Sequence, residues 1–142
     1  PSGITSIGQY AFAGCTNFST LKELPSGLKS IGDNAFMNCF KLAFTSLPSG
    51  LTSIGRYAFI SCASLALTEL PSGLLSIGQN AFEGCKGLTT LTFKTKPSFL
   101  GNNAFSKCDN LTTLNVPWAE GEVANAPWGA TSSTINYNYT GE

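Results

Sequence analysis

The 142 residues, enough for one ordinary domain, are 42% hydrophobic and 11% charged, with a formal net charge of zero. This composition is too apolar for a disordered segment, and its apolar runs are too evenly interrupted for a membrane-spanning helix. There is no basic excess of the kind that nucleic-acid-binding proteins carry, and no histidine, the commonest general base and metal ligand.

Phased repeats run along the chain from its first residues. An Ala-Phe pair recurs every 23 or 24 residues, at Ala11-Phe12, Ala35-Phe36, Ala58-Phe59, Ala81-Phe82 and Ala104-Phe105. A cysteine follows each pair at the same offset, at Cys15, Cys39, Cys62, Cys85 and Cys108. One such unit cannot bury its own apolar side chains, whereas stacked units share a continuous core. The spacing therefore predicts a solenoid of about five 23-residue repeats.

Each unit is expected to contain a strand, a turn, a return to the core and a short helical turn. The stretch after the cysteine, such as residues 65–70, has small and β-branched residues between leucines, which favours a short strand. Pro-Ser-Gly at residues 71–73 ends that strand, and Leu74 and Ile77 then return to the core. Phe82 and Cys85 are three residues apart, which favours one helical or 3₁₀ turn. We expect an α/β solenoid with parallel strands on one side and helical turns on the other.

The apolar residues of the strand segment change phase along the array. In the last two units they are two residues apart before the turn, whereas residues 44 and 47, and likewise 67 and 70, are three apart. Because side chains alternate between the two faces of a strand, this difference requires a bulge or bend in the earlier units. We predict irregular strands at residues 44–47 and 67–70, and more regular strands at residues 91–93 and 114–116.

The repeat pattern stops after Pro117, so we divide the chain into an array, residues 1–117, and a C-terminal cap with a terminal strand, residues 118–142. An open solenoid end exposes its core, and Trp118, Val123 and Trp128 are the side chains expected to cover it. An aromatic platform for sugars is the alternative use of these tryptophans. Residues 135–139 alternate and predict a last strand, or the start of a further domain. The chain begins without a leader sequence, so we expect it to be part of a longer or processed protein.

The phased cysteines and phenylalanines are expected to be core residues. Cysteines one repeat apart would lie nearer to the strand spacing of about 4.8 Å than to the roughly 3.8 Å between disulfide β-carbons. We expect buried structural thiols, with disulfide or metal chemistry as the alternative. Glu23 and Glu69 have no partner acid, base or metal ligand in sequence, which indicates surface residues. We find no catalytic, cofactor-binding or metal-ligating set and expect a chain that is not an enzyme.

A binding surface is expected on the outward side of the strand segments. Its candidate residues are small, mostly neutral and often hydroxylated: Lys22, Ala43, Thr45, Ala66, Thr68, Thr90, Thr92, Thr113 and Asn115. We call these nine residues the strand face. A flat, weakly charged face suits a broad contact with a protein or a glycan better than it suits a deep pocket. The alternative is that these side chains only solvate the sheet.

The unit Leu-Pro-x-x-Leu-x-x-Ile-Gly-x-x-Ala-Phe-x-x-Cys-x-x-Leu resembles the bacterial BspA-like, or treponemal-class, leucine-rich repeats. The resemblance covers residues 1–117, although the fifth unit has Lys94 in place of the proline. It implies a secreted or surface-attached bacterial protein that adheres to host or matrix proteins or to other cells. The alternative is a passive spacer in a larger envelope protein. We expect a monomer with a protein or glycan partner, without a cofactor, nucleic-acid binding or membrane insertion.

Overall fold

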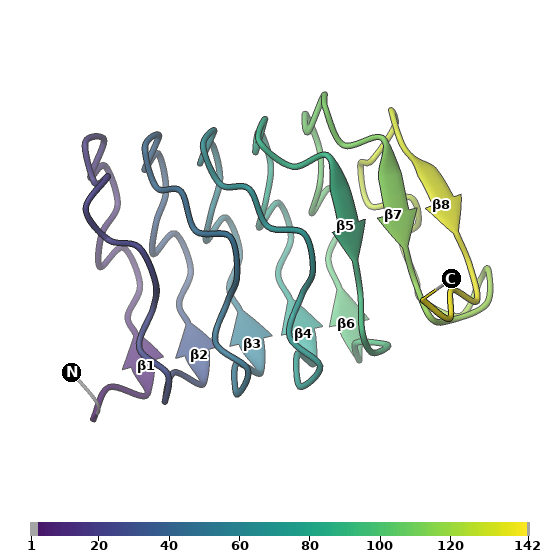
Figure 1. Ribbon diagram of the computed structural model, residues 1–142, viewed down its shortest axis with the longest axis horizontal. Helices are drawn as coiled ribbons and strands as arrows, with labels where there is room; N and C mark the ends of the chain where they lie inside the picture. The colour runs from purple at the N-terminus through teal and green to yellow at the C-terminus, as the bar shows by residue number, and fades with distance from the viewer. Residues whose placement is uncertain (1–2, 142) are drawn as a thin grey trace.

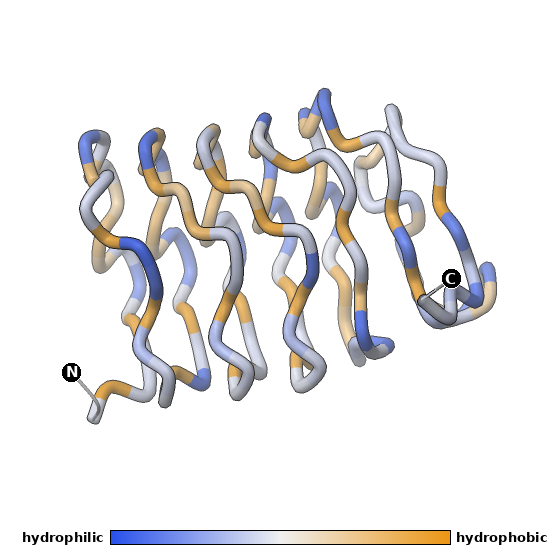
Figure 2. The backbone as a smooth tube through the Cα atoms, in the orientation of Figure 1, coloured by the Kyte–Doolittle hydropathy of each residue, from blue (hydrophilic) through white to orange (hydrophobic). Residues whose placement is uncertain are grey.

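The computed structural model describes residues 3–141 as a row of stacked coils with the two chain ends at opposite ends of the row (Figure 1). Its strands are β1 (Ser6–Ile7), β2 (Ser30–Ile31), β3 (Ser53–Ile54), β4 (Ser76–Ile77), β5 (Thr90–Thr92), β6 (Phe99–Leu100), β7 (Thr113–Asn115) and β8 (Thr134–Asn136). Hydrophobic residues recur at corresponding places in successive coils (Figure 2). The predicted solenoid of stacked repeats is confirmed.

The longer of the two sheets is built from four Ser-Ile pairs and from Phe99–Leu100, which the sequence did not indicate as strands. It is parallel, with the order β1-β2-β3-β4-β6, and lies along the lower side of Figure 1. Neighbouring serines pair in register, as Ser30 does with Ser53, and the isoleucine that follows each one is buried. The return to the core predicted for Ile77 is therefore correct. The chain also forms a parallel ladder there, because equivalent Ser-Ile pairs of successive coils lie in register.

The segments after the cysteines form regular strands only towards the C-terminal end. There β5, β7 and β8 make a second parallel sheet. The earlier segments, residues 44–47 and 67–70, form no strand. One backbone hydrogen bond connects their coils: Ala66 N–H, just before the second segment, donates to Phe44 O at 3.1 Å. An isolated bridge then links Glu69 to Thr92. The predicted contrast between irregular and regular units is confirmed, with the regular strands beginning one residue earlier than expected.

The predicted helical or 3₁₀ turns are wrong, because residues 3–141 contain turns but no helix. Cys85 N–H does donate to Phe82 O at 3.2 Å, as a single tight turn requires. The alternate N–H groups, however, leave the turn: Phe82 donates to Ala104 O and Gly84 to Ser106 O, both at 2.8 Å in the next coil. Asn80 and Gly84 adopt φ angles of 58° and 73°, which interrupt a right-handed helical run. These segments therefore stabilise the stacking of coils instead of forming helices.

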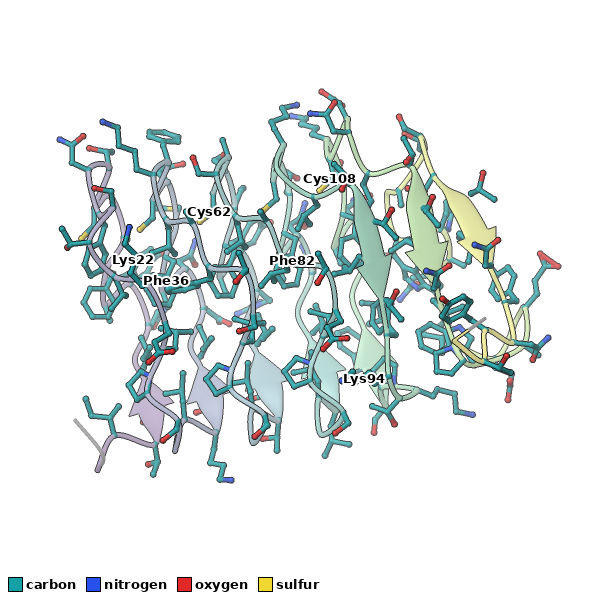
Figure 3. All side chains as sticks on the ribbon, viewed as in Figure 1. Lys22, Phe36, Cys62, Phe82, Lys94 and Cys108 are labelled. Carbon is teal, nitrogen blue, oxygen red and sulfur yellow. The ribbon has the colours of Figure 1, made fainter. Side chains whose placement is uncertain are left out.

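The phenylalanines of the Ala-Phe pairs form one column through the core, as predicted (Figure 3). Phe59 lies between Phe36, at a ring-centroid distance of 5.3 Å, and Phe82, at 5.5 Å, with rings tilted by 3° and 6°. Phe44 and Phe93 meet this column edge-on, each at an interplanar angle of 87°. Offset and edge-on arrangements are those that aromatic quadrupoles favour. The column therefore fixes the registry of successive coils.

The last segment continues the stack. Phe105 N–H donates to Trp128 O at 2.9 Å, just as Phe82 N–H donates to Ala104 O one coil earlier. Trp118, Val123 and Trp128 are buried, as predicted for residues that cover the end of the core. The predicted terminal strand is confirmed in β8, which pairs in parallel with β7. The division of the chain at residue 117 stays a proposal.

Candidate binding face

The strand-face residues lie on successive coils. Thr90, Thr92, Thr113 and Asn115 belong to β5 and β7, which lie beside β8 in the front of Figure 1, and the other five lie on the preceding coils. Six of the nine are exposed: Lys22, Ala43, Thr45, Ala66, Thr68 and Thr90. Thr92 and Thr113 are half-buried. The exposed part of the face is thus mostly uncharged, and it is held on a backbone whose inward leucines and phenylalanines are fully packed.

Asn115 differs from the others because it is buried, with 6% of its surface exposed. Its Nδ2 donates to Thr92 Oγ1 at 3.0 Å, and its Oδ1 accepts from Asn136 Nδ2 at 2.8 Å. In-register parallel strands place equivalent side chains one strand spacing apart, so polar side chains at one position can bond in a chain. Asn115 therefore links β5, β7 and β8 and offers little accessible surface to a partner.

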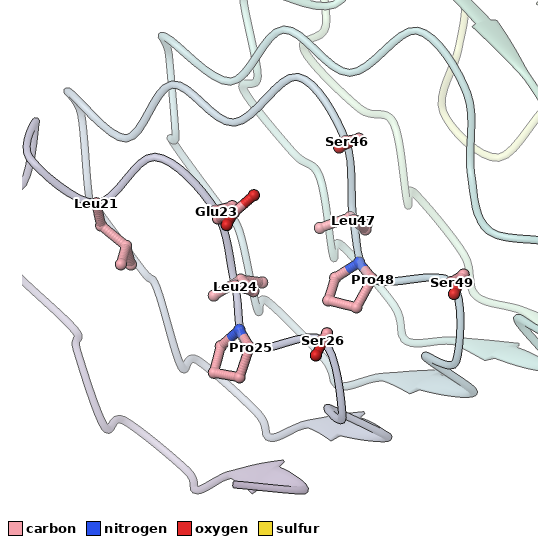
Figure 4. Close-up of a pocket in the computed structure, with 9 residues that line it drawn as sticks. All are labelled: Leu21, Glu23, Leu24, Pro25, Ser26, Ser46, Leu47, Pro48 and Ser49. Carbon is pink, nitrogen blue, oxygen red and sulfur yellow. The ribbon is translucent and has the colours of Figure 1, made fainter. Parts of the chain in front are cut away.

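A shallow groove lies beside the N-terminal part of the face, and sequence reasoning missed it (Figure 4). Its lining includes Leu21, Glu23, Leu24, Pro25, Leu47 and Pro48. The two Leu-Pro pairs stand at the same phase of neighbouring coils, and the first of them lies within the one interval between Ala-Phe pairs that is 24 residues long. That irregular spacing was the available signal, but a spacing alone does not reveal that the two segments leave a hollow between them.

Charge contributes little to the face. Lys22 Nζ donates to Ser19 O at 2.8 Å, and Lys94 Nζ forms an ion pair with Glu69 Oε1 at 3.1 Å. Both partners of that pair are about half exposed, and exposed pairs of this kind typically contribute less than about 1 kcal/mol. Binding through this face would therefore depend on shape and contact area more than on electrostatic attraction.

The cysteines are free thiols and form a second column beside the phenylalanines. Cys39, Cys62, Cys85 and Cys108 are buried, and each Sγ donates to the carbonyl oxygen of the phenylalanine 26 or 27 residues earlier, at 3.0–3.2 Å. Burial raises the pKa of Cys62 to about 12 and that of Cys108 to about 11. The buried thiols therefore stay protonated and act as small apolar side chains with one donor each.

Raising the pH above 9 is expected to weaken the fold through these thiols. The pKa of Cys62 rises from an ordinary 9.0 to about 12 on folding, because burial disfavours the thiolate. Between these values the unfolded chain has lost a proton that the folded chain keeps. The stabilisation is therefore complete below pH 9 and is lost as the pH rises towards 12, by about 1.4 kcal/mol per pH unit for this one thiol.

Urea denaturation of the wild type and of Cys62→Ala, between about pH 8 and about pH 10.5, measures this effect. The free energy of unfolding of the variant should fall less steeply with pH, by the contribution of one thiol. Equal slopes in the two proteins would show that Cys62 does not resist ionisation in the folded chain.

Within residues 3–141, no three histidine, cysteine or acidic side chains are grouped where they could hold a metal ion. The same part of the chain has no helix long and apolar enough to cross a membrane.

Comparisons with known proteins agree with this architecture. The family model of the BspA type leucine-rich repeat region matches residues 1–119 in six copies. The crystal structure of a T. pallidum leucine-rich repeat protein is 30% identical, with a TM-score of 0.77 over 97% of this chain and 67% of that one. A leucine-rich repeat protein from Bacteroides ovatus is 29% identical, with a TM-score of 0.52 over 79% of this chain and 35% of that one.

A leucine-rich cell surface protein from Faecalibacterium prausnitzii shares the fold at 20% identity, with a TM-score of 0.54 over 99% of this chain and 59% of that one. The search of curated proteins found no match. The present chain therefore spans between about a third and two thirds of the length of these three solved relatives.

Proposed function

The chain belongs to the BspA type leucine-rich repeat family, and from this premise we propose that it is a non-catalytic binding module that contacts its partner through the strand face. The partner is a protein or glycan on a host cell, in the matrix or on a neighbouring cell. The module acts outside the cell or at its surface, as part of a secreted or surface-attached protein. Leucine-rich repeat domains generally mediate protein–protein interactions, which makes a protein the first partner to test.

The observation that carries this proposal is the row of exposed, mostly uncharged side chains from Ala43 to Thr90 on a rigid core. Stacked coils hold these side chains at fixed spacings, so a partner meets a preorganised surface and binding orders little of the chain. Stable interfaces bury on the order of 800 Å² per partner, which several adjacent coils can supply and a single coil cannot. An extended solenoid face is suited to such a broad contact.

The proposal is tested by blocking the strand face with arginine side chains. Wild-type chain, a Thr68→Arg/Thr90→Arg variant and an Asn102→Arg control are compared for binding to immobilised matrix proteins, host cells and glycan arrays. Thr68 and Thr90 are exposed on the strand face, whereas Asn102 is exposed in the turn after β6. We expect the double variant to lose at least about tenfold in affinity, since two long charged side chains would prevent close contact. The Asn102→Arg control should bind as the wild type does.

Equal thermal stability of the three proteins would show that the loss comes from the surface. Failure of the wild type to bind any of these partners would contradict the proposal and favour the passive spacer. Binding that both arginine variants retain would place the contact elsewhere on the molecule.

A further inference from the structure

We propose that the groove between residues 21–26 and 46–49 binds an extended peptide segment of the partner. An apolar side chain of that peptide enters the groove, and a basic residue beside it pairs with Glu23. This inference rests on the proposed binding function and assigns one part of the partner to a defined place. Three independent features of the groove support it: its apolar floor, its two flanking segments that are not hydrogen-bonded to each other, and its single free charge.

The floor of the groove consists of apolar side chains that are themselves almost completely buried. Leu24 and Leu47 retain 7% and 9% of their surface, and Leu21, Pro25 and Pro48 are half-buried around them (Figure 4). Each of the two leucines precedes a proline, whose ring fixes φ and so restricts the backbone at the wall of the groove. A concave site of aliphatic side chains favours an aliphatic or aromatic anchor, because burial of apolar surface is its main source of affinity.

The two backbone segments that flank the groove are not hydrogen-bonded to each other. Among the described residues, no backbone hydrogen bond joins residues 19–24 to residues 42–47. Further along the array the equivalent segments are joined: Leu70 N–H donates to Thr92 O, and Thr92 N–H donates to Thr68 O, both at 3.0 Å. The N-terminal coils thus keep donors and acceptors that the later coils have used. An extended peptide can bond such groups through its own main chain, as strands do when they add to a sheet.

Charge at the groove comes from Glu23 and distinguishes this place from its equivalents. Glu23 is exposed and makes no ion pair among residues 3–141. One coil along, the same position is the uncharged Ser46, and two coils along it is Glu69, which pairs with Lys94. The adjacent Lys22 directs its Nζ to Ser19 O. A free carboxylate at the rim favours a basic residue in the peptide and provides selectivity more than affinity.

The experiment uses two pools of short synthetic peptides with a central leucine or phenylalanine, one flanked by lysine and one by glutamate. Each pool is titrated into the ¹⁵N-labelled chain, and amide shifts are followed by NMR. We expect shifts at residues 21–26 and 46–49, with the basic pool binding about fivefold more tightly than the acidic pool. In Glu23→Lys this preference should reverse.

Glu69→Lys is the matched control, because it makes the same change at the equivalent position two coils along, outside the groove between residues 21–26 and 46–49. Glu69 lines a separate hollow there with Phe93 and Lys94, so the control is read from the amide shifts of residues 21–26 and 46–49 alone. It should keep the preference for the basic pool. Ser46→Trp places a large ring at the groove and should abolish shifts from both pools while the amide spectrum stays folded.

Each other outcome overturns the proposal. It fails if neither pool shifts these residues, or if Glu23→Lys keeps the wild-type preference. It also fails if the shifts depend on the concentration of the labelled chain and not on that of the peptide, because a second copy of the chain then occupies the groove. It also fails if a glycan, and no peptide, shifts the groove residues. The proposed function is judged separately: partner binding that Thr68→Arg/Thr90→Arg destroys and Ser46→Trp leaves unchanged would support the strand face and reject the groove.

Discussion

Replacement of Gly78 by alanine is expected to lower the free energy of unfolding by about 3 kcal/mol, whereas the same change at Gly8 should have little effect. A β-carbon at Gly78 would lie 2.4 Å from Arg56 N and 2.6 Å from the carbonyl carbon of Gly55. Both atoms belong to the backbone of the preceding coil, so no side-chain rotation can relieve the clash. Gly78 N–H also donates to Ile54 O at 2.8 Å, and a shift that made room would break this bond.

Gly8 is the matched control because it stands at the same place in the Ser-Ile-Gly motif. A β-carbon there would meet nothing within 4 Å. Neither glycine has a positive φ, so backbone conformation does not separate the two variants. Chemical denaturation of the wild type and both variants measures the difference. Similar losses at Gly8 and Gly78 would show that the close approach of neighbouring coils is not what requires glycine.

The residues that recur at one spacing could be placed from the sequence, since a solenoid puts equivalent positions side by side. Phe59 and Cys62 are where the repeat predicts them, in two columns of the core. The ladder at Ser53 could not be foreseen, because a strand of two residues has no alternation to detect. The helical turn was wrongly predicted from the three-residue spacing of Phe82 and Cys85, which a single tight turn satisfies equally well.

The binding face was less predictable than the core for a related reason. Outward positions could be assigned by alternation, but alternation does not say which outward side chains bond to one another. Asn115 is buried because Thr92 and Asn136 flank it in register, and Asn136 lies outside the repeat pattern. The groove beside Leu24 depends on two segments that do not pair, which is a property of the backbone and not of residue type.

The second large effect is expected for Phe59→Ala, which should lower the free energy of unfolding by about 3–5 kcal/mol. Phe59 is fully buried, and its ring stacks on Phe36 and on Phe82, so the truncation removes contacts with two coils and leaves a cavity between them. Domains are commonly stable by only about 5–15 kcal/mol, so this loss is a large fraction of the total. Because each coil contacts mainly its neighbours, the damage should also weaken the coupling between the two halves of the array.

Two variants bracket this prediction in the same urea denaturation experiment. Phe40→Ala changes a ring that is 45% exposed and should cost less than about 0.5 kcal/mol. Phe12→Ala removes the half-buried first ring of the column, which stacks on Phe36 alone within the column, and should fall between the other two. The order Phe59, Phe12, Phe40 follows from the number of coils that each ring contacts. If Phe12→Ala costs as much as Phe59→Ala, the column does not transmit stability from coil to coil, and the stacked rings only fill space within each coil.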